Sequence, residues 1–75
     1  MTDQFTKGVI KDLTELFKLV PESKEVQAMA FRLAQVESKA YCESDMDESE
    51  TADLLIAEAR VQVAAGVLPS EIAGD

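Results

Sequence analysis

The acidic segment at residues 43–50 holds the densest group of side chains that could carry chemistry. Oxygen-bearing side chains alternate along it and beyond it, as they do in a calcium-binding loop: Asp45, Asp47, Ser49, Thr51 and Asp53. An EF-hand loop also requires glycine at its sixth position and glutamate at its twelfth, whereas this chain has Glu50 and Ile56 there. Because both requirements fail, we expect no metal site and interpret the segment as the acidic start of a helix.

Other residues that serve as metal ligands or nucleophiles are scarce. The chain has no histidine and a single cysteine, Cys42, which excludes an internal disulfide and makes a four-ligand zinc site implausible. Cys42 stands beside acidic residues rather than beside the basic groups that activate a thiol. The sequence also lacks a glycine-rich phosphate loop and a serine nucleophile motif. It therefore predicts neither an enzyme nor a cofactor.

Charge is distributed unevenly along the chain. Residues 1–42 hold six basic and six acidic residues, whereas residues 43–75 hold nine acidic residues and Arg60 alone. The whole net charge of −8 therefore belongs to the second half. A field of this sign repels phosphate groups, so we expect no direct binding to DNA or RNA. It attracts a basic protein surface, and we expect a partner protein of that kind.

Size and composition favour one small domain, residues 1–75, that associates with itself. The apolar fraction is 47%, but ten of these residues are alanines, which bury little area. Because a core of this kind is thin, we expect a homodimer. No stretch approaches the roughly 18 consecutive apolar residues that span a membrane. Met1–Gln4 lacks the pattern of a signal peptide, so we expect no membrane association and a cytoplasmic location.

The first helix is predicted over residues 3–20. Its apolar stripe repeats every three or four residues, which is the period of one helix face. The stripe consists of Phe5, Val9, Leu13, Leu16, Phe17 and Val20. Pro21 disfavours helical geometry at the residue before it and ends the helix. Gly8 leaves two interpretations open: another helix approaches closely there, or the helix begins near it.

The second helix is predicted over residues 22–42, with Pro21 at its start. Its apolar stripe consists of Val26, Met29, Ala30, Leu33, Val36, Ala40 and Tyr41. Phe31 falls away from this stripe. It marks either a second contact surface or a singly exposed aromatic side chain, which is normal on protein surfaces.

The third helix is predicted over residues 47–65. Asp47 followed by Glu50 has the spacing of a capping box, as does Ser44 followed by Asp47. Gly66 is suited to the C-terminal cap, with Val67 or Leu68 folding back, and a proline then prevents continuation. Apolar residues occupy more than one face of this helix, which is typical of burial on several sides. A monomer needs only one such face, so the excess also favours a dimer.

The sequence thus predicts an all-α fold, a small antiparallel bundle of three helices with a short C-terminal tail that makes one turn. We expect a small protein-interaction or regulatory protein that binds another protein through a helix face. The alternative is a nucleic-acid mimic, whose acidic C-terminal half occupies the basic groove of a DNA- or RNA-binding protein. The candidate partner-binding residues are Glu43, Asp45, Asp47, Glu48, Glu50 and Phe31.

Overall fold

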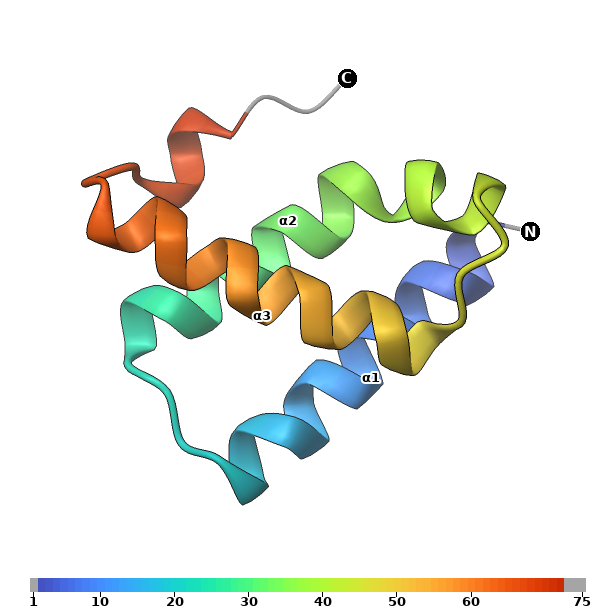
Figure 1. Cartoon of the computed structure of the whole chain (residues 1–75), viewed down its shortest axis with the longest axis horizontal. Helices are drawn as coiled ribbons and strands as arrows, with labels where there is room; N and C mark the ends of the chain where they lie inside the picture. Colours follow the sequence, from blue (N-terminus) through green and yellow to red (C-terminus); the bar gives the residue numbers. More distant parts are fainter. Residues whose placement is uncertain (1, 73–75) are drawn as a thin grey trace.

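Three α-helices make up most of the computed structural model, which describes residues 2–72 (Figure 1). The helices are α1 (Thr2–Leu19), α2 (Lys24–Glu43) and α3 (Glu48–Ala64), and a short 3-10 helix, η1 (Pro69–Glu71), follows them. Residues 2–72 contain no β-strand. Helix α1 is roughly antiparallel to α2, and α3 returns in the opposite sense while crossing α2 obliquely (Figure 1). The predicted all-α bundle of three helices is confirmed.

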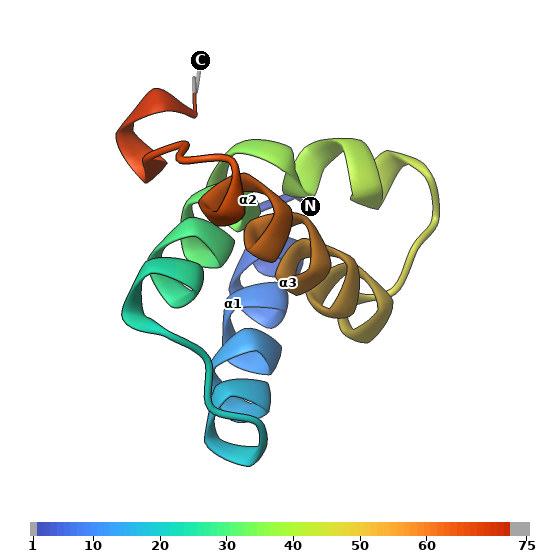
Figure 2. The same cartoon turned by 60° about the vertical axis from the view of Figure 1, so that its left-hand side comes forward.

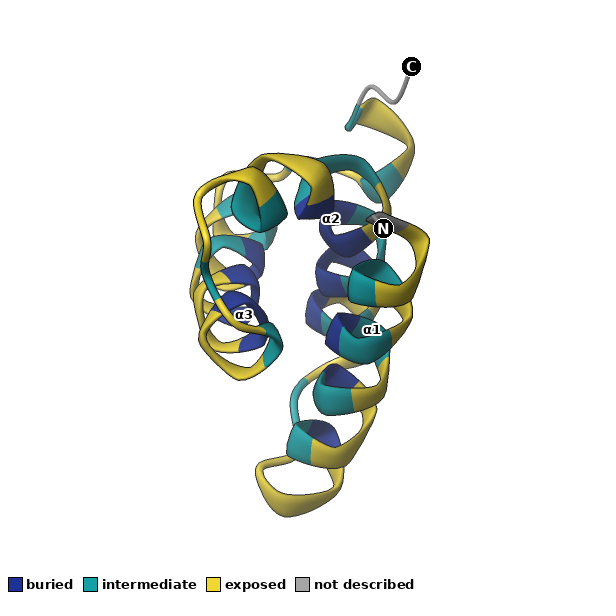
Figure 3. Cartoon of the chain, turned by 90° about the vertical axis from the view of Figure 1, so that its right-hand side faces the viewer, coloured by how far each residue is buried: buried dark blue, intermediate teal, exposed yellow. Residues whose placement is uncertain are grey.

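The core lies between the three helices, on whose inner sides Figure 3 shows the buried positions. Its largest fully buried apolar side chains are Leu13, Met29, Leu33, Leu55 and Val9. Fully buried alanines occupy the positions between them: Ala30, Ala34, Ala52 and Ala59. Because alanine is small, the helices approach closely and the molecule is thin, with extents of 31 × 30 × 15 Å.

Helix α1 excludes one of the two interpretations of Gly8 and corrects the end of its apolar stripe. The helix runs without a break through Gly8, so it does not begin there, and the carboxylate of the Glu48 side chain lies against the glycine. Val20 was predicted to be part of the apolar face, but it is 57% exposed. The reason is that the C-terminal end of α1 projects beyond the other two helices (Figure 3).

Helix α2 begins later than predicted. Ser23 is its N-cap, and the Ser23 hydroxyl accepts a 3.2 Å hydrogen bond from the backbone N–H of Val26. Pro21 therefore precedes the helix instead of forming its first turn.

The predicted stripe of α2 is wrong at Ala40, which is exposed, while Ser38 is buried. Periodicity missed Ser38 because serine is polar, yet its hydroxyl donates to the carbonyl oxygen of Ala34 and is satisfied within the helix.

The predicted caps of α3 are confirmed. Asp47 is the N-cap, and its Oδ1 accepts a 2.7 Å hydrogen bond from the backbone N–H of Glu50. At the other end Gly66 has a φ of +82°, and the N–H of Val67 donates to the carbonyl of Gln62. Val67 packs back against the core, whereas Leu68 remains 60% exposed.

The C-terminal segment lies beside α2 at the end of the bundle (Figure 2). The expected single turn is η1, which begins at Pro69, and residues 73–75 of the predicted tail lie outside the described residues. In the described part of the chain, no helix is long and apolar enough to cross a bilayer.

Candidate functional site

The five acidic candidates gather at one end of the bundle, in the turn between α2 and α3 (Figure 1). We call residues 43–50 the acidic turn. Two of its five acids serve the fold. Asp47 caps α3, and the half-buried Glu48 lies against Gly8 of α1. Acids in the first turn of α3 also interact favourably with the helix dipole. The cluster is therefore explained in part by helix formation.

The other three acids of the turn, Glu43, Asp45 and Glu50, are exposed. Within residues 2–72 their carboxylates make no ion pair. Asp45 has a φ of 60°, a left-handed conformation that favours glycine. The N–H groups of Asp45 and Met46 donate to the carbonyls of Cys42 and Tyr41, which is the hydrogen-bond pattern that ends α3 at Gly66. An aspartate thus occupies a position where glycine would be more stable.

Phe31 contacts the inside of the molecule. Its ring meets that of Phe17 on α1 edge to face, with 5.6 Å between centroids and an interplanar angle of 80°. It is partly buried against the core, so the second contact surface expected for this residue includes another helix of the same chain.

The outer face of α3 carries an exposed apolar stripe that was not among the candidate sites. The stripe consists of Leu54, Ala57, Val61 and Ala64, and we call it the outer stripe. Leu54 is 47% exposed and Val61 is 66% exposed. The spacing of three, four and three residues places the four side chains on one side of the helix, opposite the buried residues. The predicted excess of apolar surface on this helix is therefore located on its solvent side.

A second candidate surface, partly apolar and partly charged, lies between α1 and α3. Two neighbouring hollows, of about 180 and 160 Å³, share Leu16 of α1 and Asp53 of α3 in their walls. We call the pair the α1–α3 trough. The sequence pattern did not predict the trough, because Leu16 and Ile56 have the spacing of ordinary core positions. The hollows depend on the way α1 and α3 diverge in the folded chain.

One ion pair spans the far end of this trough. Arg60 of α3 donates hydrogen bonds to the carboxylate of Glu22, one of them 3.2 Å long, just before α2 begins. The hydrogen bond from Arg60 lowers the pKa of Glu22 below its ordinary value. Both groups therefore stay charged at neutral pH and hold the start of α2 beside α3.

A third group of titratable side chains lies between α2 and α3. Partial burial, followed by the nearby carboxylate of Glu58, raises the pKa of Glu37. Burial also raises the pKa of Tyr41, with smaller contributions from the same two carboxylates. The Glu37–Glu58 pair is therefore a place where the fold opposes ionisation.

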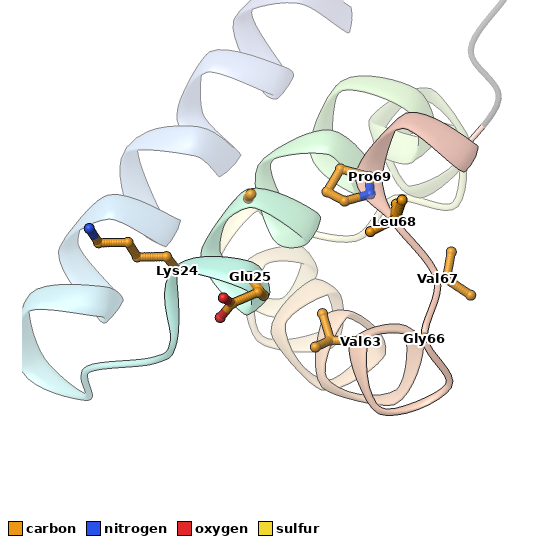
Figure 4. Close-up of a pocket in the computed structure, with 8 residues that line it drawn as sticks. Lys24, Glu25, Val63, Gly66, Val67, Leu68 and Pro69 are labelled. Carbon is orange, nitrogen blue, oxygen red and sulfur yellow. The ribbon is translucent and has the colours of Figure 1, made fainter.

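Another hollow, of about 420 Å³, is apolar and lies where α2 begins and α3 ends (Figure 4). Val63, Leu68 and Pro69 line it, while Lys24 extends away from these side chains in Figure 4. Its lining offers hydrophobic contact and few polar groups that could orient a ligand.

No cluster suited to a metal ion forms among residues 2–72. In the segment that resembled a calcium loop, Thr51 is buried and its hydroxyl donates to the carbonyl of Asp47. Of the remaining oxygen-bearing residues, Asp45 lies in the turn before α3 and Asp47 is the N-cap, while Ser49 and Asp53 lie on the helix itself.

Comparison with known proteins adds no relative: no protein family, curated protein or solved structure matches this chain. The site is therefore interpreted from its own geometry.

Proposed function

We propose that this chain is a small interaction or regulatory protein that binds another protein through a face of its helices. The outer stripe of α3 is the observation that supports this proposal. Leu54 and Val61 expose apolar side chains there, although the same helix already buries Leu55 and Ala59 in the core. A contiguous apolar surface on a small protein is typical of a protein-binding site.

The shape of the outer stripe suits a helix of a partner. Ala57 and Ala64 alternate with the two larger residues, so a second helix can approach α3 closely and place its side chains between them. In recognition of this kind, side chains that repeat at helical spacing on the bound helix contact the surface.

The homodimer expected from the sequence is the alternative occupant of the same surface. A second copy presents an identical outer stripe, and two-fold pairing of α3 would cover Leu54 and Val61 of both copies in place of a helix of another protein. Such pairing would supply apolar burial that the thin core does not provide. Sedimentation equilibrium measures the mass in solution and tests this part directly.

Nucleic-acid mimicry is the competing proposal, and the acidic turn supports it. Glu43, Asp45 and Glu50 are exposed there and project negative charge into solvent. Three free carboxylates around one turn form a short track in comparison with a nucleic-acid backbone, which carries a charge at each phosphate. We therefore rank mimicry second.

Paired variants of equal charge separate the two proposals. Leu54→Glu with Val61→Glu adds two acids to the outer stripe, and Gln4→Glu with Gln35→Glu adds two acids at exposed positions elsewhere. Affinity capture from the native host, with both variants compared to the unmodified chain, is the measurement. We expect partner binding to be lost in the stripe variant and kept in the control.

A mimic would give the opposite pattern. Both added-charge variants would keep the partner, whereas Glu43→Gln with Asp45→Asn and Glu50→Gln would lose it. Raising the salt concentration to several hundred millimolar would release a mimic's partner, because such binding depends on charge. Apolar contact with the outer stripe would persist under the same conditions.

A further inference from the structure

The α1–α3 trough combines an apolar floor with apolar side chains at its edge. Leu16 and the nearly buried Ile56 form the floor. Leu19, 78% exposed, and Val20, 57% exposed, stand at the edge contributed by the projecting end of α1. Large side chains exposed next to a hollow provide apolar area that a partner can cover.

Carboxylates surround this apolar floor. Asp12 and Glu15 extend from α1 and Asp53 from α3, and all three line the hollow nearer the start of α3. Within residues 2–72 the structure records one ion pair, Glu22–Arg60, which leaves these three carboxylates without a basic partner. In the described part of the chain, the hydrogen bond recorded for these carboxylates is a long one, 3.5 Å from the Ser49 hydroxyl to Asp12. The trough is therefore apolar at its floor and negative at its rim near the start of α3, while the Glu22–Arg60 ion pair lines its other end.

The length of the trough along α3 corresponds to a short helical segment. On α3 its lining extends from Ser49 to Arg60, which corresponds to about 16 Å at the rise of an α-helix. That length accommodates roughly three helical turns. A bound helix would place apolar residues at i, i+3, i+4 and i+7 over the floor.

We infer that the α1–α3 trough binds a basic amphipathic helix of another protein, with lysine or arginine on both sides of its apolar face. This inference goes beyond the proposed function: it adds a second binding surface, separate from the outer stripe, and names the chemistry of the segment that this surface binds. Basic side chains would meet Asp12, Glu15 and Asp53, and apolar side chains would cover Leu16 and Leu19. Charge complementarity guides such encounters and selects against acidic helices.

A second copy of the chain does not fit this site. The lysines of α1, Lys7, Lys11 and Lys18, lie on its exposed side, away from its apolar stripe. The exposed stripe of α3 has Asp53 and Glu58 beside it. Docking the outer stripe of another copy in the trough would therefore bring carboxylates together, which is unfavourable.

Fluorescence anisotropy with a synthetic peptide tests the inference. The probe is a labelled helix of about 16 residues, with leucine at i, i+3, i+4 and i+7 and lysine on both sides. One control peptide has glutamate in place of lysine, and another has the same composition in scrambled order. We expect the full-length chain to bind the first peptide alone.

Matched variants locate the binding. Asp12→Asn with Glu15→Gln and Asp53→Asn removes three charges from the trough, and Glu43→Gln with Asp45→Asn and Glu50→Gln removes three from the acidic turn. We expect the first set to raise Kd by about tenfold or more and the second by less than about twofold. Leu19→Gln, at a position 78% exposed, is also expected to weaken binding while the circular dichroism melting curve stays unchanged.

Several outcomes would overturn the inference: no binding of the lysine peptide, equal binding of the scrambled peptide, or equal loss in both charge-removal variants. Retained affinity in Leu19→Gln would also contradict it. The stripe variant Leu54→Glu with Val61→Glu distinguishes this failure from failure of the proposed function. If the lysine peptide binds in the trough, the stripe variant still binds it. Whether the stripe variant loses the native partner is a separate test of the outer stripe.

Discussion

Arg32 of α2 donates two hydrogen bonds, of 3.2 and 3.0 Å, from its guanidinium to the carbonyl oxygen of Ile72. The two residues are 40 positions apart, so this contact fixes the C-terminal segment on α2. Ile72 packs against the core in the same place. The Arg32 hydrogen bonds and the packing of Ile72 thus hold the C-terminal segment against α2.

Loss of this contact should release the C-terminal segment. Arg32→Gln is expected to speed proteolysis between residues 66 and 72 and to lower the free energy of unfolding by about 1–2 kcal/mol. Lys39→Gln removes one exposed positive charge from the same helix and is the control. Equal proteolysis rates in the two variants would show that the guanidinium does not hold the segment.

The contact between Gly8 of α1 and Glu48 of α3 predicts that substitutions at these two positions have coupled effects on stability. A Cβ at Gly8 would overlap the Glu48 carboxylate, which must then move. Alanine also favours a helix over glycine by about 1 kcal/mol. We expect Gly8→Ala to stabilise the fold by that amount in a Glu48→Ala background and by less in the native chain. Urea denaturation measures the difference, and equal gains in both backgrounds would contradict the contact.

The left-handed backbone at Asp45 predicts that glycine is the more stable residue there. Asp45→Gly is expected to raise the free energy of unfolding by about 1 kcal/mol. Gly66→Ala is the reciprocal change, since Gly66 also has a positive φ and a Cβ there would meet nothing within 4 Å. It should lower stability by about 1 kcal/mol through backbone strain alone. A destabilised Asp45→Gly variant would show that the Asp45 carboxylate makes a contact that stabilises the fold by more than the backbone strain costs.

The raised pKa of Glu37 predicts a pH dependence of stability. The folded chain holds a proton on Glu37 more tightly than the unfolded chain does, because of burial and the Glu58 carboxylate. Its contribution therefore favours folding at low pH and is lost as the pH rises through the folded pKa. Glu37→Gln should be more stable than the native chain at pH 7, by less than about 1 kcal/mol for a half-exposed group.

Thermal melts from pH 7 down to pH 4 check this sign. The advantage of Glu37→Gln should shrink as the pH falls toward the ordinary glutamate pKa of about 4.3. Glu25→Gln, at an exposed position in the first turn of α2, is the control. A Glu37→Gln variant that loses stability at pH 7 would contradict the account of this pair.

Local signals in the sequence account for the helix boundaries. Pro21, Asp47 and Gly66 each act on the backbone within a few residues, and each ends or begins a helix near the predicted position. The periodic spacing of apolar residues identified most buried positions, because it too is a local property of the sequence. It was wrong at Val20, because exposure there depends on how far α1 extends past its neighbours.

The surfaces depend on tertiary packing and were harder to predict. Excess apolar residues in α3 were visible in the sequence, but only the packing shows that Leu54 and Val61 are the exposed ones. The partner of Phe31 could not be predicted either, because its contact with Phe17 joins different helices. The trough likewise combines residues of α1 with residues more than thirty positions later in the chain.

Site-specific photo-cross-linking in the native host identifies the face of the bundle that the partner contacts. A photoreactive amino acid is placed at Val61 in the outer stripe, at Glu43 in the acidic turn, or at Gln35 on the exposed side of α2. If the partner binds the outer stripe, a defined protein adduct forms from position 61 and none forms from position 35. An adduct that forms from position 43 and not from position 61 would contradict it and place the partner on the acidic turn.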